Sequence, residues 1–319
     1  KNGFSLYRFQ KNLSLLLSQT QTTKRMQRYS VGIEYFGGAF NGWQHNLELA
    51  KFKSVQSCVE HALDKFVGSS NHGGAVISSR TDKGVHALRN VFHVDLRRRK
   101  RKIGELMPAH DPLTVKRALN SLLAGYQVSV LDVQQVPLEY HARFHATGRT
   151  YTYRILSGCS NPSIFEKDYL WGVPEHLNCS LMQEAAKCLV GTHDFSSFRS
   201  SGCQARSPVK TLSEVNIEYV SKGLLRESMG HSSGQIIHIS MTGNSFLYHM
   251  VRNIVGALYK VGSGEMNAGY IADLLKACNK EKAPPPAPAA GLFLVDVRYD
   301  DTFQHQTCSI NKKPNIILQ

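Results

Sequence analysis

The sequence predicts an α+β fold in which a mixed, mainly antiparallel sheet is flanked by helices. Segments that alternate apolar and polar residues, as strands do, are interspersed with segments of helical periodicity. The two kinds of segment follow no regular βαβ order, and no strand leads into a glycine-rich nucleotide-binding fingerprint. The chain has 319 residues, of which 42% are hydrophobic, so it can bury a large core.

The first half of this fold is expected over residues 28–140. Ser54 is a typical helix N-cap, and Gly68 stands where the apolar helical pattern ends. The expected strands cover 28–37, 75–78, 91–96 and 127–136, and the expected helices cover 54–68 and 112–123.

The second half is expected over residues 141–300, with a soft boundary near residue 140. Its expected strands lie within 140–156 and at 212–220, 235–242 and 292–299, and its expected helices cover 180–190, 247–262 and 271–279. A loop is expected over 192–211 and a proline-rich connector over 282–291. Residues 1–27 and 301–319 are expected to be tails.

The charge of the chain points to a polyanionic partner. There are 38 Lys and Arg against 24 Asp and Glu, which gives a formal net charge of +14 and a pI of about 9.5. Cationic surfaces attract phosphate groups and release their counterions. The run RRRKRK (97–102) cannot pack inside and is expected to contact phosphates, although a role in solubility alone remains open.

Cysteine spacing and the amino-terminal segment bear on the compartment. The seven cysteines form no CxxC pair, which disfavours both a zinc site and a disulfide framework, and no apolar run has the length of a membrane span. The first 28 residues carry six Lys or Arg and no acid, as mitochondrial transit peptides do. If translation starts at Met26, the location would instead be the cytoplasm or nucleus.

The stretch ISSRTDKGVHA (77–87) is the leading candidate for chemistry. It places the Asp82 carboxylate between Arg80 and Lys83 in a turn that leads into an apolar strand. By itself this composition indicates an ordinary tight turn. Its interest comes from arginines in unusual settings elsewhere in the chain, of which Arg252 is the clearest because its helix is otherwise apolar. Such a guanidinium either has an anionic partner or lies on a solvated stripe.

Taken together, the motifs resemble those of the TruA-type tRNA pseudouridine synthase family, and most closely its eukaryotic tRNA pseudouridine synthase-like branch. The similarity runs from about Tyr29 to Tyr299 and includes, in order, YFGGAFNGWQ, SVQ, SSRTDKGVHA, RFHATGRTYTYR, GTHDFSSFR, CQARSP, NSFLYHMVRNIVG and APAAGLFL. The resemblance implies an active cleft between two related halves of the sheet. It also implies isomerisation of uridine to pseudouridine in tRNA, typically in the anticodon arm, by a homodimer without metal or organic cofactor.

The resemblance also implies roles for individual residues. Asp82 matches the catalytic aspartate, Arg80 the arginine that helps to extrude the target base, and Tyr151 the tyrosine that stacks on the uracil and is a candidate acceptor for the C5 proton. Arg252 matches the arginine that pairs with the aspartate, and Leu292 an apolar residue of the pocket. Further candidates for phosphate contacts are Arg97, Arg98, Arg99, Lys100, Arg101, Lys102, Arg143 and Arg206.

Two departures from the family pattern and two alternative functions remain open. Ser79 and Lys83 replace residues common in bacterial members, and Lys83 could contact phosphate or pair with Asp82. One alternative is a non-catalytic tRNA-binding or folding protein on the same platform, and another is a glycosylase acting on a flipped nucleotide. For the isomerase, attack of Asp82 on C1′ and abstraction of a sugar proton are both compatible with the sequence.

Overall fold

The computed structural model describes residues 26–44, 54–98, 107–222 and 234–300. In this part of the chain, ten strands form one sheet in the order β4-β1-β3-β10-β5-β9-β8-β7, with β2 paired to β3 and β6 paired to β5. The strands are β1 (Gln27–Tyr35), β2 (Val76–Ile77), β3 (His86–Leu96), β4 (Val128–Val136), β5 (Ala146–Ser157), β6 (Trp171–Val173), β7 (Gly191–Asp194), β8 (Val209–Lys222), β9 (Gln235–Gly243) and β10 (Leu292–Tyr299).

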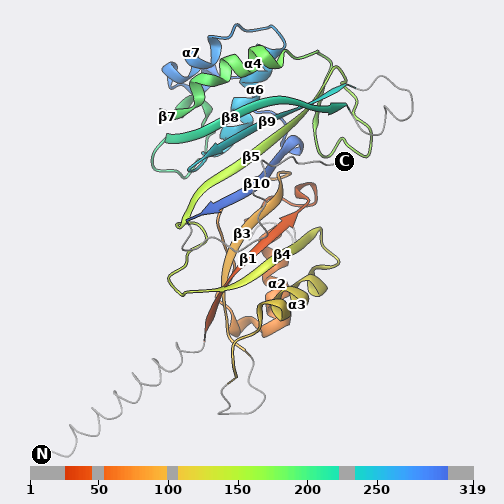
Figure 1. Ribbon diagram of the computed structural model, residues 1–319, viewed down its shortest axis with the longest axis vertical. Coiled ribbons are helices and arrows are strands. Elements are labelled where there is room, and N and C mark those ends of the chain that lie inside the picture. Colours follow the sequence, from red (N-terminus) through yellow and green to blue (C-terminus); the bar gives the residue numbers. More distant parts are fainter. Residues whose placement is uncertain (1–25, 45–53, 99–106, 223–233, 301–319) are drawn as a thin grey trace, which may run out of the picture.

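Most strand pairs are antiparallel, and the predicted α+β class is therefore confirmed. The parallel pairs among the described strands are β10 with β3 and β5 with β6. β10 comes last in the described chain, yet it lies in the middle of the sheet. It pairs with β3 on one side and antiparallel with β5 on the other, and this joins the strands of both halves into one sheet (Figure 1).

Five α-helices among the described residues cover the two ends of the sheet. Figure 1 shows α2 (Val55–Val67) and α3 (Pro112–Leu123) beside β1, β3 and β4. At the other end, α4 (Cys179–Ala186), α6 (Met250–Gly262) and α7 (Tyr270–Ala277) lie beside β7, β8 and β9. The middle of the sheet, where β3, β10 and β5 meet, lies between these two groups of helices.

The helix signals predicted for the first half are confirmed. Ser54 caps α2 in a reciprocal capping box with Ser57, and Gly68 follows the helix with a φ of 90°. α3 begins at Pro112, behind Asp111, whose carboxylate accepts a hydrogen bond from the Thr114 amide at 3.0 Å. These caps fix where each helix starts and so which face packs on the sheet.

Several predicted boundaries in the second half are wrong. β7 lies inside the predicted loop 192–211, and β6 was not predicted at all; both are too short to show an alternating pattern. The helix predicted from residue 180 to 190 ends at Ala186 and continues as a 3₁₀ turn. The helix predicted from residue 247 begins only at Met250, because His249 adopts a left-handed backbone conformation.

The predicted division near residue 140 falls in the connection between β4 and β5 and stays a prediction. Residues 1–25 of the expected tail 1–27 and the whole expected tail 301–319 lie outside the described residues, as do four of the six cations in the run 97–102. Gln27, which was expected in the tail, is the first residue of β1.

Candidate active site

The loop that carries Asp82 connects β2 to β3 and is held by hydrogen bonds on both sides. The amide of Val85 donates to the Asp82 carbonyl at 3.1 Å, and Gly84 closes the turn with a φ of 80°. The Trp43 amide donates to the Thr81 carbonyl at 3.1 Å. Because these contacts are to the backbone, the position of the Asp82 side chain is set by the fold.

Buried side chains support the same loop from beneath. Asn90 on β3 accepts a hydrogen bond from the Ser78 hydroxyl at 2.9 Å and donates to the Ser79 carbonyl at 2.8 Å. The Tyr35 hydroxyl shares a 2.7 Å hydrogen bond with that of Thr81. A network of this kind limits the motion of the loop.

A cavity of about 780 Å³ opens over this loop, and its lining brings together six of the nine predicted site residues that the structure describes. Six predicted residues line it: Arg80, Asp82, Arg143, Tyr151, Arg252 and Leu292. Arg206 is exposed on the loop whose residues 202–205 also line the cavity, whereas Arg97 and Arg98 lie at the far end of β3. Arg99, Lys100, Arg101 and Lys102 lie outside the described residues.

Asp82 lies in a largely desolvated position, with its side chain 25% exposed. Burial raises the pKa of this carboxyl to about 6, against the positive charge of Arg252, which lowers it. Lys83 is exposed and adds a cation at the rim of the cavity. At neutral pH the carboxylate is therefore mainly ionised, and a small change in its surroundings can protonate it.

His249 is the side chain that approaches Asp82 most directly among the described ion-pair contacts. Its Nε2 lies 3.6 Å from Oδ2 of Asp82. Burial and the charges of Arg252 and Lys280 lower the pKa of His249 to about 4, so its ring is neutral at pH 7. The ring also stacks on Tyr248, with centroids 3.8 Å apart.

Arg252 acts on Asp82 through its charge at longer range. Its Nε donates to the Ala287 carbonyl at 2.6 Å, and its own carbonyl accepts from the Ala287 amide at 3.0 Å. These bonds tie α6 to the connector that leads into β10. The predicted direct pairing of Arg252 with Asp82 stays a prediction, because the ion-pair contact described for Asp82 is the one with His249.

Tyr151 projects from β5 into the cavity and is largely buried. Its hydroxyl shares a 2.9 Å hydrogen bond with that of Ser79, and its ring meets Phe246 edge-on with centroids 5.0 Å apart. Burial raises the pKa of the phenol to about 12. The phenol is therefore protonated at neutral pH.

Two further predicted residues complete the rim and wall. Nη1 of Arg80 donates to Oε1 of Gln204 at 3.2 Å, across the mouth of the cavity. Leu292, the first residue of β10, is buried and lines the wall. β10 thus brings an apolar side chain next to the Asp82 loop, which leads into the neighbouring strand β3.

Sequence reasoning missed His249, Tyr248 and Phe246 as parts of the site. All three belong to the motif NSFLYHMVRNIVG, which drew attention only to Arg252. His249 has a φ of 60°, which is unusual for a residue other than glycine and is typical of functional positions. The apolar helical pattern that continues through residues 247–262 hides this break.

The described residues contain no group of three or more His, Cys, Asp or Glu side chains placed to hold a metal ion. Within the same residues, no helix is long and apolar enough to cross a bilayer.

Comparison with known proteins identifies similar chains. A family model described as "tRNA pseudouridine synthase" matches residues 185–300. The chain is 39% identical over 276 residues to a protein of Rhodospirillum rubrum named "tRNA pseudouridine synthase A", covering 86% of this chain and 88% of that one. Proteins of the same name from Xanthobacter autotrophicus (37% identical over 274 residues) and Mesorhizobium japonicum (39% over 276 residues) are matched over 86% of this chain and their whole length.

Proposed function

Because the chain belongs to the TruA-type tRNA pseudouridine synthase family, we propose that it isomerises uridine to pseudouridine in tRNA, with Asp82 as the catalytic carboxylate. The observation that carries this proposal is the position of Asp82 in a cavity that Arg252, Tyr151 and Leu292 also line, with the charge of Arg252 acting on the carboxylate. The reaction is an isomerisation, so no atom or electron is gained or lost overall, and the resemblance implies that it proceeds without a metal or an organic cofactor.

The reaction breaks the bond between C1′ and N1 and joins C1′ to C5 of the same uracil. The proton on C5 leaves and N1 gains one. Asp82 serves either by attacking C1′ or by removing a proton from the sugar, and both routes require the ionised carboxylate. The charge of Arg252 favours that ionised form in a site where burial opposes it.

The surroundings of Tyr151 support a stacking role for its ring. Its phenol is protonated at neutral pH, because burial raises its pKa to about 12. The phenol oxygen also shares a hydrogen bond with the Ser79 hydroxyl. A protonated phenol cannot accept the C5 proton without first releasing its own. Stacking against Tyr151, with Leu292 excluding water, would retain the detached uracil while it turns.

The target base must leave its stack before it can reach Asp82, at a cost of a few kcal/mol. Arg80, which lines the cavity and donates to Gln204, would fill the gap that the base leaves. Phosphate contacts from Arg143, Arg206 and the cationic run 97–102 would offset part of this cost.

Finer features of the proposal rest on the resemblance and on the tail. We expect the protein to belong to the eukaryotic tRNA pseudouridine synthase-like branch, and to act as a homodimer on the anticodon arm of tRNA. The basic composition of residues 1–25 supports a mitochondrial location.

The deciding experiment maps pseudouridine in total RNA from cells that lack the protein, rescued with wild type or Asp82→Asn. We expect one or a few tRNA sites to be lost and to return only with wild type. Asp273→Asn, which removes an exposed carboxylate in the first turn of α7, is the matched control and should rescue fully. Equal rescue by Asp82→Asn would contradict the catalytic role, and an unchanged map would favour a binding protein.

A purified reaction separates the isomerase from a glycosylase. With tRNA transcripts as substrate, pseudouridine should form and free uracil should not accumulate. Free uracil as the main product would show that the excised base is not rejoined.

A further inference from the structure

The connection between β4 and β5 presents an aromatic ring beside the active cavity. Phe144 is 75% exposed, and its ring lies against that of His141 with centroids 4.2 Å apart. Its neighbour Arg143 lines the cavity. A single exposed apolar side chain is common and indicates nothing by itself. The way in which this loop is held makes Phe144 unusual.

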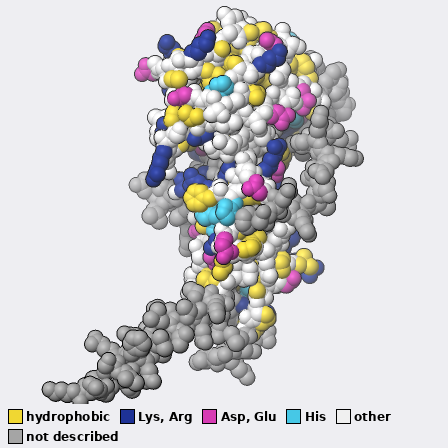
Figure 2. Space-filling view, turned by 60° about the vertical axis from the view of Figure 1, so that its left-hand side comes forward, with side chains coloured by type: hydrophobic (Ala, Val, Ile, Leu, Met, Phe, Trp, Pro, Cys, Tyr) yellow, Lys and Arg dark blue, Asp and Glu magenta, His cyan; other side chains and the backbone are white. Residues whose placement is uncertain are grey.

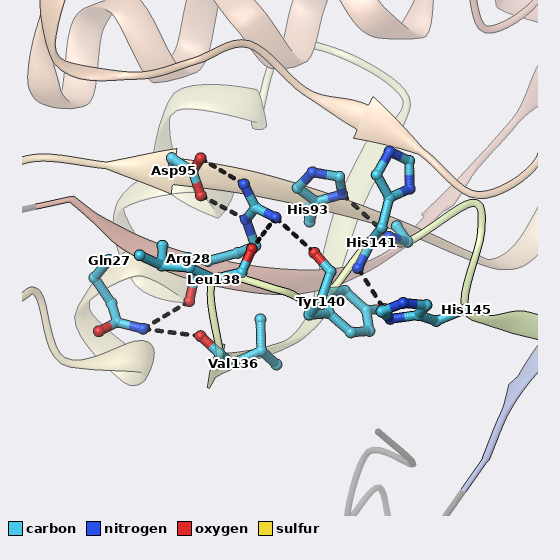
Figure 3. Close-up of polar contacts among 10 residues, drawn as sticks. Gln27, Arg28, His93, Asp95, Val136, Leu138, Tyr140, His141 and His145 are labelled. Atoms are coloured by element: carbon cyan, nitrogen blue, oxygen red, sulfur yellow. Dashed lines mark hydrogen bonds and ion pairs between the residues drawn. The ribbon is translucent and has the colours of Figure 1, made fainter. Parts of the chain in front are cut away.

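Three histidine rings accept hydrogen bonds from backbone amides of the loop. Figure 3 shows two of these hydrogen bonds. Each ring accepts backbone N–H groups through Nδ1: His93 from Ala142 at 3.1 Å, His145 from His141 at 3.3 Å, and His141 from Arg143 at 3.2 Å and Phe144 at 3.3 Å. An Nδ1 that accepts a hydrogen bond carries no proton, so these contacts require neutral rings.

Arg28, Arg149 and Tyr299 donate hydrogen bonds to backbone carbonyls of the same loop. Arg28 binds both oxygens of Asp95 and donates to the carbonyls of Leu138 and Tyr140 (Figure 3). The Tyr299 hydroxyl donates to the Ala142 carbonyl at 2.8 Å.

Arg149 connects the loop to the active site. The residue is only 7% exposed, and its guanidinium donates to four backbone carbonyls: Arg143 (3.0 Å), Ala146 (3.0 Å), Ser78 (3.2 Å) and Asn244 (2.8 Å). Ser78 immediately precedes the segment that carries Asp82. Phe144 is therefore held at a fixed position relative to the catalytic loop, although its own ring is largely in solvent.

We propose that Phe144 and Arg143 form a stacking site for an RNA base next to the target uridine. The ring takes the face of the base, and the Arg143 guanidinium takes the adjoining phosphate. This site rests on the proposed function, because extrusion of the target base leaves its neighbour without a stacking partner. An aromatic face next to an arginine is a common way in which proteins hold an unstacked base.

The charge around the loop favours RNA over a protein partner as the occupant. Figure 2 shows histidine side chains in the middle of one face, with Lys and Arg side chains and also Asp and Glu side chains near them. Arg143 and Arg80 line the same cavity, and the whole chain carries an excess of cations. A rigid aromatic also loses little conformational freedom when a base stacks on it.

The test uses a short RNA stem-loop with one uridine in the loop and 2-aminopurine on its 5′ or 3′ side. The fluorescence of 2-aminopurine falls when it stacks, and titration also gives the Kd. Asp82→Asn serves as the background, so that no product forms. Phe144→Leu removes the aromatic face and keeps an apolar side chain, whereas Phe144→Trp keeps the face. Phe165→Leu is the matched control, because Phe165 is 74% exposed and lies in the connection between β5 and β6, none of whose residues line the cavity.

We expect Phe144→Leu to raise the Kd about 5- to 140-fold, the range that removal of one base–aromatic stack gives. It should also abolish the quenching in one of the two RNAs. Phe144→Trp and Phe165→Leu should behave as the background protein does. An unchanged Kd and quenching for Phe144→Leu would overturn the stacking site and leave the ring to a protein contact. Equal weakening in Phe144→Leu and Phe144→Trp would overturn it as well, because shape rather than the aromatic face would then matter.

The same proteins separate this proposal from the proposed function. Pseudouridine formation is measured on tRNA transcripts with Asp82 restored. Quenching that depends on Phe144, together with no pseudouridine from wild type, would contradict the isomerase and support the stacking site. Normal product formation with quenching that does not depend on Phe144 would overturn the stacking site alone.

Discussion

Burial and a nearby positive charge have opposite effects on the pKa of Asp82. Burial raises its pKa to about 6, while the charge of Arg252 lowers it, and the neutral ring of His249 lies 3.6 Å from its Oδ2. A less buried carboxylate would be more fully ionised, but it would also be hydrated and less reactive toward the sugar. A fully buried one without Arg252 would be protonated.

The activity should therefore fall as the pH drops through about 6. Asp82 acts only when ionised, so kcat/KM is expected to fall about tenfold per pH unit below that value. His249, with a pKa of about 4, does not change its charge in this range. Initial rates on a tRNA transcript between pH 5 and 8 test this, with RNA binding by Asp82→Asn measured in the same buffers as the control. A rate that stays level down to pH 5 would contradict the assigned environment of Asp82.

Variants of Arg252 extend this test. Arg252→Gln removes the positive charge and should move the acid limb of the profile to higher pH, while Arg252→Lys, which keeps the charge, should leave it close to that of wild type. If both variants move the limb equally, the hydrogen bond from Arg252 to Ala287 is the cause rather than the charge.

At the residue scale, the sequence predicted side chains that its motifs contain but not those that depend on backbone geometry. Asp82, Tyr151 and Leu292 line one cavity, as expected. The contact between His249 and Asp82 could not be predicted. It depends on a left-handed backbone conformation just before α6 and on the approach of two segments that are far apart in the sequence. The structural role of Arg149, which is buried and donates to four backbone carbonyls, could not be predicted either, because its partners lie in separate segments of the chain.

At the scale of elements, the loop between β4 and β5 shows how side chains can build a rigid structure without helix or strand. Its amides donate to histidine rings and its carbonyls accept from arginine and tyrosine side chains. Because buried peptide groups must find partners, removing one of these side chains leaves several groups unsatisfied.

Arg149→Met should destabilise the protein by about 2–4 kcal/mol, since four carbonyls lose their donor while the volume is roughly kept. Urea unfolding followed by circular dichroism gives this value. Arg298→Met is the matched control, because Arg298 is exposed on β10, and it should change stability by less than about 0.5 kcal/mol. A change of similar size in both variants would mean that the bonds of Arg149 to the loop contribute little.

Element boundaries were predictable where a cap defines them. Ser54 caps α2 and α3 begins at Pro112, both as expected, because helix starts depend on local interactions. β6 and β7 were missed because three or four residues carry no readable period and their pairing is set by β5 and β8. The start of α6 was misplaced because a single φ of 60° interrupts a continuous apolar pattern.

At the scale of the whole molecule, the excess of positive charge should make RNA binding strongly dependent on salt. Replacing the six cations of the run 97–102 with Gln should weaken binding and reduce the slope of log K against log salt by about 0.7–0.9 for each phosphate that is no longer neutralised. Titrations of a tRNA transcript at several salt concentrations measure the slope. Lys65→Gln with Lys276→Gln, which are exposed on α2 and α7, form a control whose slope should change less. An unchanged slope in the six-residue variant would assign the run to solubility alone.

The class of fold was predictable, but the order of its strands was not. Alternating segments without βαβ order indicate an antiparallel sheet, and that pattern is local. The placement of β10 between β3 and β5 depends on contacts between residues far apart in the chain, such as Phe293 with His86 and Leu292 with Tyr153. No periodicity in the sequence encodes that neighbour relation.

The central position of β10 also determines the order in which parts of the sheet can form while the chain is being synthesised. A growing chain can pair β1 with β3 and β4, and later β5 with β9 and β8, as soon as each segment leaves the ribosome. Among the described strands, β10 is the one that pairs with both blocks, so the two blocks stay unpaired with each other until residues 292–299 have been made. Leu292, a wall of the cavity, arrives with that bridge. A nascent chain that stalls before β10 therefore carries Asp82 but lacks a complete active site, so the enzyme should become competent only after β10 has been made.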